Sequence, residues 1–157
     1  MCSIFKFLKN NRMKLPKELL NGGIIFIGIA LYFLLMNALG YADLFYLRLL
    51  NVLFVFYGVN KTIEMNLAQG KKTFIANAVS AMITSIIGVS LSIIGLVIYS
   101  YMQGGDAYVS SLSKTFLFGG NPSVNTYSIC LLFEGLASSV IVTLLIMLYW
   151  NNRFTTD

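Results

Sequence analysis

Long apolar segments are the feature that most constrains this chain. A helix needs roughly 20 mostly apolar residues to cross a bilayer, and four segments meet this length. Their bounds are about 17–39, 44–66, 73–101 and 125–150. Only 11% of the residues are charged, whereas a soluble domain carries about 25%. The sequence therefore predicts an all-α integral membrane bundle of four transmembrane helices, residues 16–152, after a basic N-terminal segment, residues 1–15.

The N-terminal segment places four basic side chains among apolar ones. This pattern is typical of a short amphipathic stretch on the surface of the inner leaflet. An equally weighted alternative is that Met13 rather than Met1 is the true start, because the residues after Met13 lead directly into the first apolar segment. No small-residue cleavage site follows the first apolar run, so no removable signal peptide is expected.

The second apolar segment is predicted to begin with Asp43 as its N-cap. A short connection before it makes the first two segments an antiparallel hairpin. The helix is expected to continue past Lys61, where Thr62, Glu64 and Asn66 form a polar, water-facing end.

Small residues recur along the third apolar segment in alternating steps of four and three. They are Ala81, Ser85, Gly88, Ser92 and Gly95. Small side chains at this spacing let two helix backbones approach closely and are typical of a helix-packing seam. Gly135 in the last segment offers a close approach to the same seam. The alternative is a chance pattern in a helix rich in glycine and serine.

The long connection at residues 102–126 is bracketed by two glycine pairs. Between them Val109, Leu112 and Phe116 recur at helical spacing, which predicts a short interfacial helix between the third and fourth spans. A re-entrant or pore-lining loop is the less favoured alternative.

Basic residues predict the orientation of the chain. Nine of the eleven lie in the N-terminal part up to the start of the first span, from the end of the second span to the start of the third, or after the last span. They are Lys6, Lys9, Arg12, Lys14, Lys17, Lys61, Lys71, Lys72 and Arg153. The positive-inside rule then predicts a multi-pass protein of the inner (cytoplasmic) membrane with both termini in the cytoplasm. The net charge of +5 is explained by this asymmetry, so no nucleic acid partner is expected.

The residue types that are missing limit the chemistry. Histidine is absent, and the two cysteines, Cys2 and Cys130, lie far apart in the sequence. No metal-ligand spacing and no Ser-His or Cys-His pair is present. We therefore expect no catalytic residue, no metal and no cofactor, and do not expect an enzyme.

Glu134 is the most informative residue, because an ionisable side chain inside a span costs at least ~2.5–3.5 kcal/mol and is a functional candidate by default. Counted from the ends of their segments, Arg48 and Asn51 lie at a depth in the membrane similar to that of Glu134. We predict that Arg48 pairs with Glu134, with Asn51 and Asn37 completing the hydrogen bonds. Ser138 lies one turn from Glu134 on the same face.

Two functions follow from this polar cluster. The favoured one is an accessory or scaffold subunit, or a self-associating membrane protein, in which the ion pair fixes helix docking. Its partners would be the lipid bilayer and a homo-oligomer or larger membrane complex. The alternative is a small ion- or proton-coupled transporter using Glu134. A dry ion pair favours the first function, and a water-accessible Glu134 in a groove favours the second.

Three stretches carry a resemblance to a known family: YLRLLNVLFVFYGVN, FLFGGNPS and LLFEGLASSVIV. They resemble the small four-span membrane proteins of Bacteroidota that are classed as a domain of unknown function. The resemblance covers residues 16–150 approximately. It implies a four-helix inner-membrane protein and implies no biochemical activity.

Overall fold

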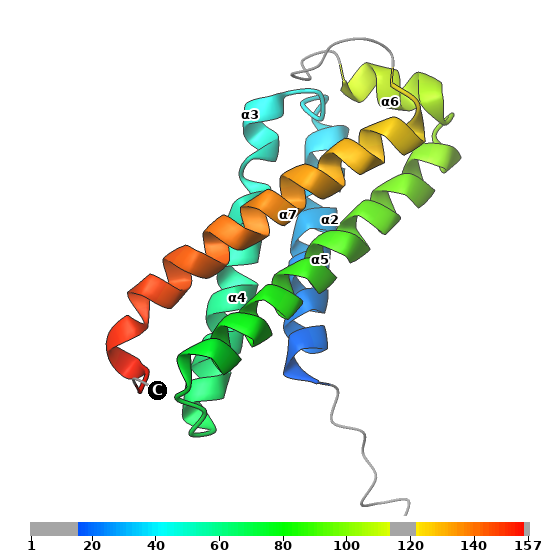
Figure 1. The fold of residues 1–157 in the computed structure, drawn as a ribbon. Helices are drawn as coiled ribbons and strands as arrows, with labels where there is room; N and C mark the ends of the chain where they lie inside the picture. The colour runs from blue at the N-terminus through cyan, green and yellow to red at the C-terminus, as the bar shows by residue number, and fades with distance from the viewer. Residues whose placement is uncertain (1–15, 114–121, 156–157) are drawn as a thin grey trace, which may run out of the picture.

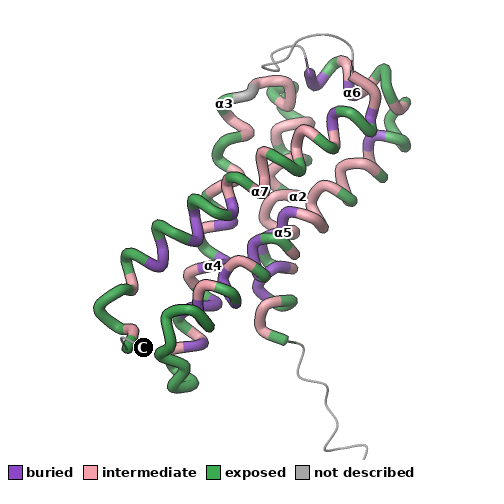
Figure 2. The backbone as a smooth tube through the Cα atoms, viewed as in Figure 1, coloured by how far each residue is buried: buried purple, intermediate pink, exposed green. Residues whose placement is uncertain are grey.

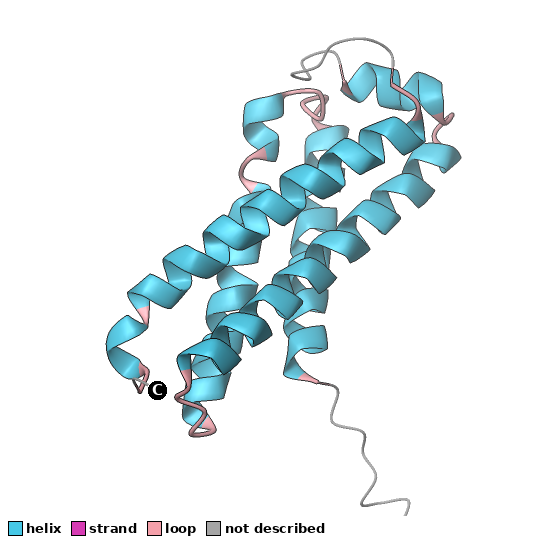
Figure 3. Ribbon diagram, in the orientation of Figure 1, coloured by secondary structure: helices cyan, strands magenta, loops and turns pink. Residues whose placement is uncertain are grey.

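The described part of the chain consists mainly of helices joined by short loops. The computed structural model describes residues 16–113 and 122–155, and within them no strand forms (Figure 3). The elements are α2 (Lys17–Ala38), α3 (Phe45–Arg48), α4 (Asn51–Ala68), α5 (Phe74–Met102), α6 (Asp106–Leu112), α7 (Val124–Tyr149) and the 3₁₀ helix η1 (Asn151–Arg153). Three of them, α2, α5 and α7, are long and apolar enough to cross a membrane. The predicted segment at residues 1–15 lies outside the described residues, as does Phe116.

The four long helices run side by side as a bundle (Figure 1). α5 packs along both α2 and α7, while α4 contacts all three of the other long helices. The start of α2, the turn between α4 and α5 and the C-terminus lie at one end of the bundle, here named the terminal end. α3 and α6 lie at the opposite end, here named the α6 end (Figure 1).

The second apolar segment differs from the prediction of one continuous helix. It divides into α3 and α4, with Leu49 and Leu50 between them. Their ψ angles are −24° and −16°, and the Leu50 amide donates to the Leu47 carbonyl three residues back (3.1 Å). This geometry is a tightened 3₁₀ turn. The prediction of Asp43 as N-cap is wrong, because Leu44 holds that position and no side chain caps α3.

Ile25 is the centre of the tightest packing. A Cβ added to Gly58 would lie 2.4 Å from Ile25 Cγ1, and one added to Gly88 would lie 2.6 Å from Ile25 Cβ. The side chain of Ile25 from α2 therefore fills the space that these two glycines leave on α4 and α5. Buried positions gather where these three helices meet (Figure 2).

The predicted small-residue seam on α5 has more than one neighbour. Ala81 and Ser85 are fully buried, and Gly88 lies against α2. A Cβ on Gly95 would meet the ring of Phe26 on α2 at 3.1 Å. A Cβ on Gly135 of α7 would meet Val89 of α5 at 2.4 Å. Small residues thus permit close contacts of α5 with both α2 and α7.

Candidate functional site

Arg48 and Glu134 come together between α3 and α7. The guanidinium Nη2 lies 3.4 Å from the carboxylate Oε2, and the Arg48 and Glu134 side chains remain 18% and 35% exposed. Charge-assisted N–H···O bonds are usually about 2.7–2.9 Å long. The ion pair is therefore long and only partly buried, and it joins two residues that are 86 positions apart in the sequence.

Tyr127 is a third member of this cluster that the sequence reasoning missed. Arg48 Nη1 donates to the Tyr127 hydroxyl at 2.7 Å, and the guanidinium carbon lies 5.8 Å from the centre of the ring. The available signal was its spacing, because Tyr127 precedes Glu134 by seven residues and so shares its helix face.

The pair borders a cavity of about 310 Å³ between the long helices. Most of the lining is aliphatic or aromatic and comes from α2, α4, α5 and α7. The polar lining includes Arg48, Glu134, Asn51, Tyr127 and Ser138. A mainly apolar concavity of 300–1,000 Å³ with a few convergent polar groups is typical of small-molecule sites. Cys130 does not line it, although it precedes Glu134 by one turn.

The remaining predicted members do not complete the hydrogen bonding of the pair. Asn51 Oδ1 is buried without a hydrogen-bond partner among the described residues. The Ser138 side chain lines the cavity but makes no hydrogen bond within the described part of the chain. Asn37 instead bonds to two tyrosines, donating to Tyr99 (3.1 Å) and accepting from Tyr108 (2.9 Å).

Tyr108 connects α6 to the helices beneath it. Its ring meets the Tyr99 ring edge-on at 5.8 Å, and burial, with smaller contributions from Tyr99 and Tyr127, raises its pKa to about 12. Asp106 Oδ1 also accepts a bond from the amide of Val124 at the start of α7 (2.8 Å). α6 is therefore fixed to α2, α5 and α7 as a cap on this end of the bundle.

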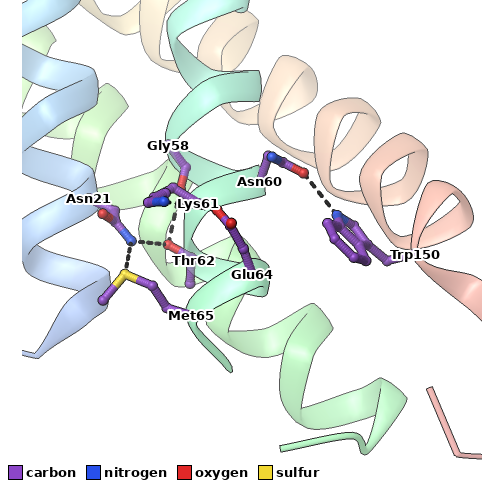
Figure 4. Close-up of polar contacts among 8 residues, drawn as sticks. All are labelled: Asn21, Gly58, Asn60, Lys61, Thr62, Glu64, Met65 and Trp150. Carbon is purple, nitrogen blue, oxygen red and sulfur yellow. Dashed lines mark hydrogen bonds and ion pairs between the residues drawn. The ribbon is translucent and has the colours of Figure 1, made fainter. Parts of the chain in front are cut away.

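A second polar cluster lies in the terminal half. Asn21 Nδ2 donates to Thr62 Oγ1 at 2.8 Å, and the hydroxyls of Thr62 and Thr84 are 3.0 Å apart. The three side chains come from α2, α4 and α5 and are at most 1% exposed. Figure 4 shows Asn21 between Thr62 and the sulfur of Met65. The prediction that Thr62 and Asn66 face water is wrong, because both point into the bundle and are buried.

Polar contacts also surround this cluster towards the terminal end. Glu18 accepts a bond from Ser80, and Lys61 pairs with Glu64 on the exposed face of α4 (2.9 Å). The Trp150 indole donates to Asn60 Oδ1 at 2.8 Å, which joins the end of α7 to α4 (Figure 4).

The described residues contain no group of three or more His, Cys, Asp or Glu side chains that is arranged to hold a metal ion. At the α6 end, one carboxylate and one guanidinium instead meet tyrosine and asparagine side chains in an apolar cavity. Chemically, this set can bind a polar group or an ion. Comparisons of the chain with protein-family models, curated proteins and solved structures find no match.

Proposed function

We propose that the chain spans the inner membrane four times, with α3 and α4 together as one of the spans. α4 packs along α2, α5 and α7, each of which is long and apolar enough to cross a membrane. A helix that lies beside three spanning helices shares their depth. An even number of spans puts both termini on one side, and the positive-inside rule makes that side the cytoplasm.

In this orientation α6 lies at the outer interface of the membrane. Val109 and Leu112 are buried against the bundle, while Ser110 and Ser111 face away from it. A short helix with one apolar and one polar face fits the boundary between headgroups and acyl chains.

The function that the geometry supports best is reversible binding of a small molecule within the membrane, as a carrier or receptor. One observation carries this proposal: the Arg48–Glu134 pair borders a cavity instead of closing a dry helix interface. The ion- or proton-coupled transporter is one form of this function, with Glu134 as the ion-binding group. Among the described residues that line the cavity, Glu134 is the one carboxylate and no second acid lies beside it, which supports a non-enzymatic role.

Occupancy of the cavity tests the proposal. Protein extracted from membranes in mild detergent should retain a small molecule in native mass spectrometry. Ala30 lines the cavity, so Ala30→Phe should fill part of it and abolish retention. Ala137 is exposed on the outer side of α7, and Ala137→Phe is the matched control that should retain the molecule. Equal retention by the two variants would overturn the proposal.

The accessory, scaffold or self-associating subunit is the second candidate. It is supported by the same ion pair, because Arg48 and Glu134 connect α3 to α7 and so help to fix their docking. In this case the cavity has no ligand. Labelling of Ser138→Cys, in a chain whose Cys2 and Cys130 are replaced by Ser, separates the candidates. A small thiol reagent should modify it if the cavity is accessible and leave it unmodified if the helices pack dry.

A further inference from the structure

The polar groups of the cavity indicate which class of molecule it binds, on the premise that the proposed binding function is correct. We propose that the ligand is an uncharged, single-chain amphiphile whose head group carries a hydrogen-bond-donating hydroxyl. Three features carry this inference: the hydrogen-bonding capacity left unused in the cavity, its charge balance and its apolar length.

The unused hydrogen-bonding capacity at the cavity includes two acceptors. Glu134 receives one long contact, at Oε2, and its other carboxylate oxygen has no partner within the described part of the chain. Asn51 Oδ1 is likewise buried without a partner among the described residues. A carboxylate accepts up to about four hydrogen bonds. A ligand that donates a hydrogen bond can therefore use the second carboxylate oxygen of Glu134.

The charge balance of the cavity selects a neutral donor. Of the described residues that line it, Arg48 and Glu134 are the pair that carries formal charge at neutral pH, and the two charges cancel. The tyrosines beside them are uncharged phenols. A cationic or anionic head group would add one uncompensated charge to an apolar site, which is costly. A hydroxyl adds no charge, donates one hydrogen bond to Glu134, and can accept one from Ser138.

The apolar lining is long enough for a chain. The lining positions on α7 extend from Tyr127 to Ser138, a helical rise of about 16 Å. Phe26, Val55 and Val89 line the part beyond the ion pair, while Phe33 and Leu131 line the part nearer the α6 end. The polar groups thus have apolar surface on both sides, which fits the head and chain of one slender molecule.

A competition experiment with matched twelve-carbon probes tests the ligand class. A dodecan-1-ol carrying a photoreactive diazirine on its chain labels purified protein in detergent at pH 7, and peptide mapping locates the label. Unlabelled dodecan-1-ol, dodecyl methyl ether, laurate and dodecylammonium then compete. We expect labelling of α5 and α7 residues at the cavity. Dodecan-1-ol should compete at about tenfold or more lower concentration than the ether, because a hydrogen bond to a charged group contributes about 1.5–3 kcal/mol.

Charge variants make the test sharper, since each one shifts the charge balance in a known direction. Glu134→Gln removes the carboxylate that faces Arg48 in the cavity, so laurate should become the best competitor. Arg48→Gln leaves Glu134 uncompensated, so dodecylammonium should become the best competitor. The double variant is neutral and should prefer the alcohol again. Lys61→Gln with Glu64→Gln, at an exposed ion pair, is the control and should change nothing.

The outcomes separate the two proposals. Labelling that is equal in the wild type and in Ala30→Phe would overturn both the binding function and the ligand class. Saturable labelling in which laurate or dodecylammonium is the best wild-type competitor, or in which the ether matches the alcohol, would overturn the ligand class alone. This decision needs only the wild-type protein, so it holds even where a charge variant fails to fold.

Discussion

The two polar clusters differ in how completely the protein satisfies them. In the terminal half, Asn21, Thr62 and Thr84 are neutral, fully buried and joined by hydrogen bonds of 2.8 and 3.0 Å. At the α6 end, Arg48 and Glu134 carry charge, remain partly exposed and are 3.4 Å apart beside a cavity. The first cluster lies next to glycines that allow close packing, while the second lies where the helices leave space.

This contrast indicates which cluster stabilises the packing of the helices and which can interact with another molecule. Neutral hydroxyl and amide bonds between spanning helices contribute about 0.6 kcal/mol on average, and close backbone packing adds to them. A charged pair is a costly alternative, since both ions must leave water. The satisfied cluster fits a structural role, and the incompletely satisfied charged cluster fits a binding role.

The largest predicted effect is at the packing centre of the terminal half. Gly88→Ala places a Cβ 2.6 Å from Ile25 Cβ, which is close to the α2 backbone and is not a flexible side-chain end. Overpacking of this kind typically costs about 1–3 kcal/mol. We expect a loss of that size in the free energy of unfolding, measured by denaturant titration in mixed micelles.

Gly23→Ala is the matched control for this prediction. A Cβ at Gly23 would have no neighbour within 4 Å, and alanine is the better helix former. The substitution should leave the stability unchanged or raise it slightly. An equal loss in the two variants would show that glycine itself, and not its contact with Ile25, determines the effect.

The next largest effect tests the hydrogen-bonded network. Thr62→Val keeps the volume but removes the hydroxyl that accepts from Asn21 and lies 3.0 Å from the Thr84 hydroxyl. We expect a loss of about 1 kcal/mol in the free energy of unfolding, with no change in labelling at the cavity. Thr73→Val, at the exposed start of α5, is the control. A change in cavity labelling would contradict the separation of the two clusters.

Hydropathy was sufficient to predict the long helices of the fold. The segments at 17–39, 73–101 and 125–150 correspond to α2, α5 and α7 within two residues at each end. A long apolar run of this length has few alternatives to a helix. The break at Leu49–Leu50 was not predictable. No proline or glycine marks it, and both residues keep helical dihedral angles.

Comparing the depths of residues along their segments predicted the pairing of Arg48 with Glu134, but it did not predict the rest of the site. Asn37 was assigned to the pair, although α6 brings Tyr108 to it from 71 positions away. Thr62 and Asn66 were assigned to water because they are polar, although a four-residue spacing equally well describes a buried face. Sequence indicates depth and face, whereas the neighbour on that face depends on tertiary packing.

A smaller effect is expected at the charged pair. The double-mutant cycle of Arg48→Gln and Glu134→Gln should give a coupling of about 0.5–1 kcal/mol in the free energy of unfolding, because the pair is long and partly exposed. Ligand preference should change far more than stability. A coupling of several kcal/mol would instead mean that the pair is a structural element like the Thr62 network, and would weaken the contrast between the clusters.

The smallest effect concerns the cap formed by α6. The pKa of Tyr108 is raised to about 12 from 10.0, so the folded protein favours the neutral phenol. The stability from this preference is fully present below pH 10 and is lost as the pH rises from about 10 to about 12. Tyr108→Phe should cost about 0.5 kcal/mol at pH 8 through the lost bond to Asn37.

The same substitution should flatten the fall in stability above pH 10. Thermal unfolding at pH 8, 10 and 11 measures the stability, and absorbance at 295 nm follows phenolate formation. Ser110→Ala, on α6 but without a titrating group, is the control and should retain the wild-type slope. If Tyr108→Phe retained the wild-type slope as well, the phenol of Tyr108 would be no less accessible in the folded than in the unfolded chain. The α6 cap would then be open to solvent, and the cavity beneath it would be reachable from the membrane surface.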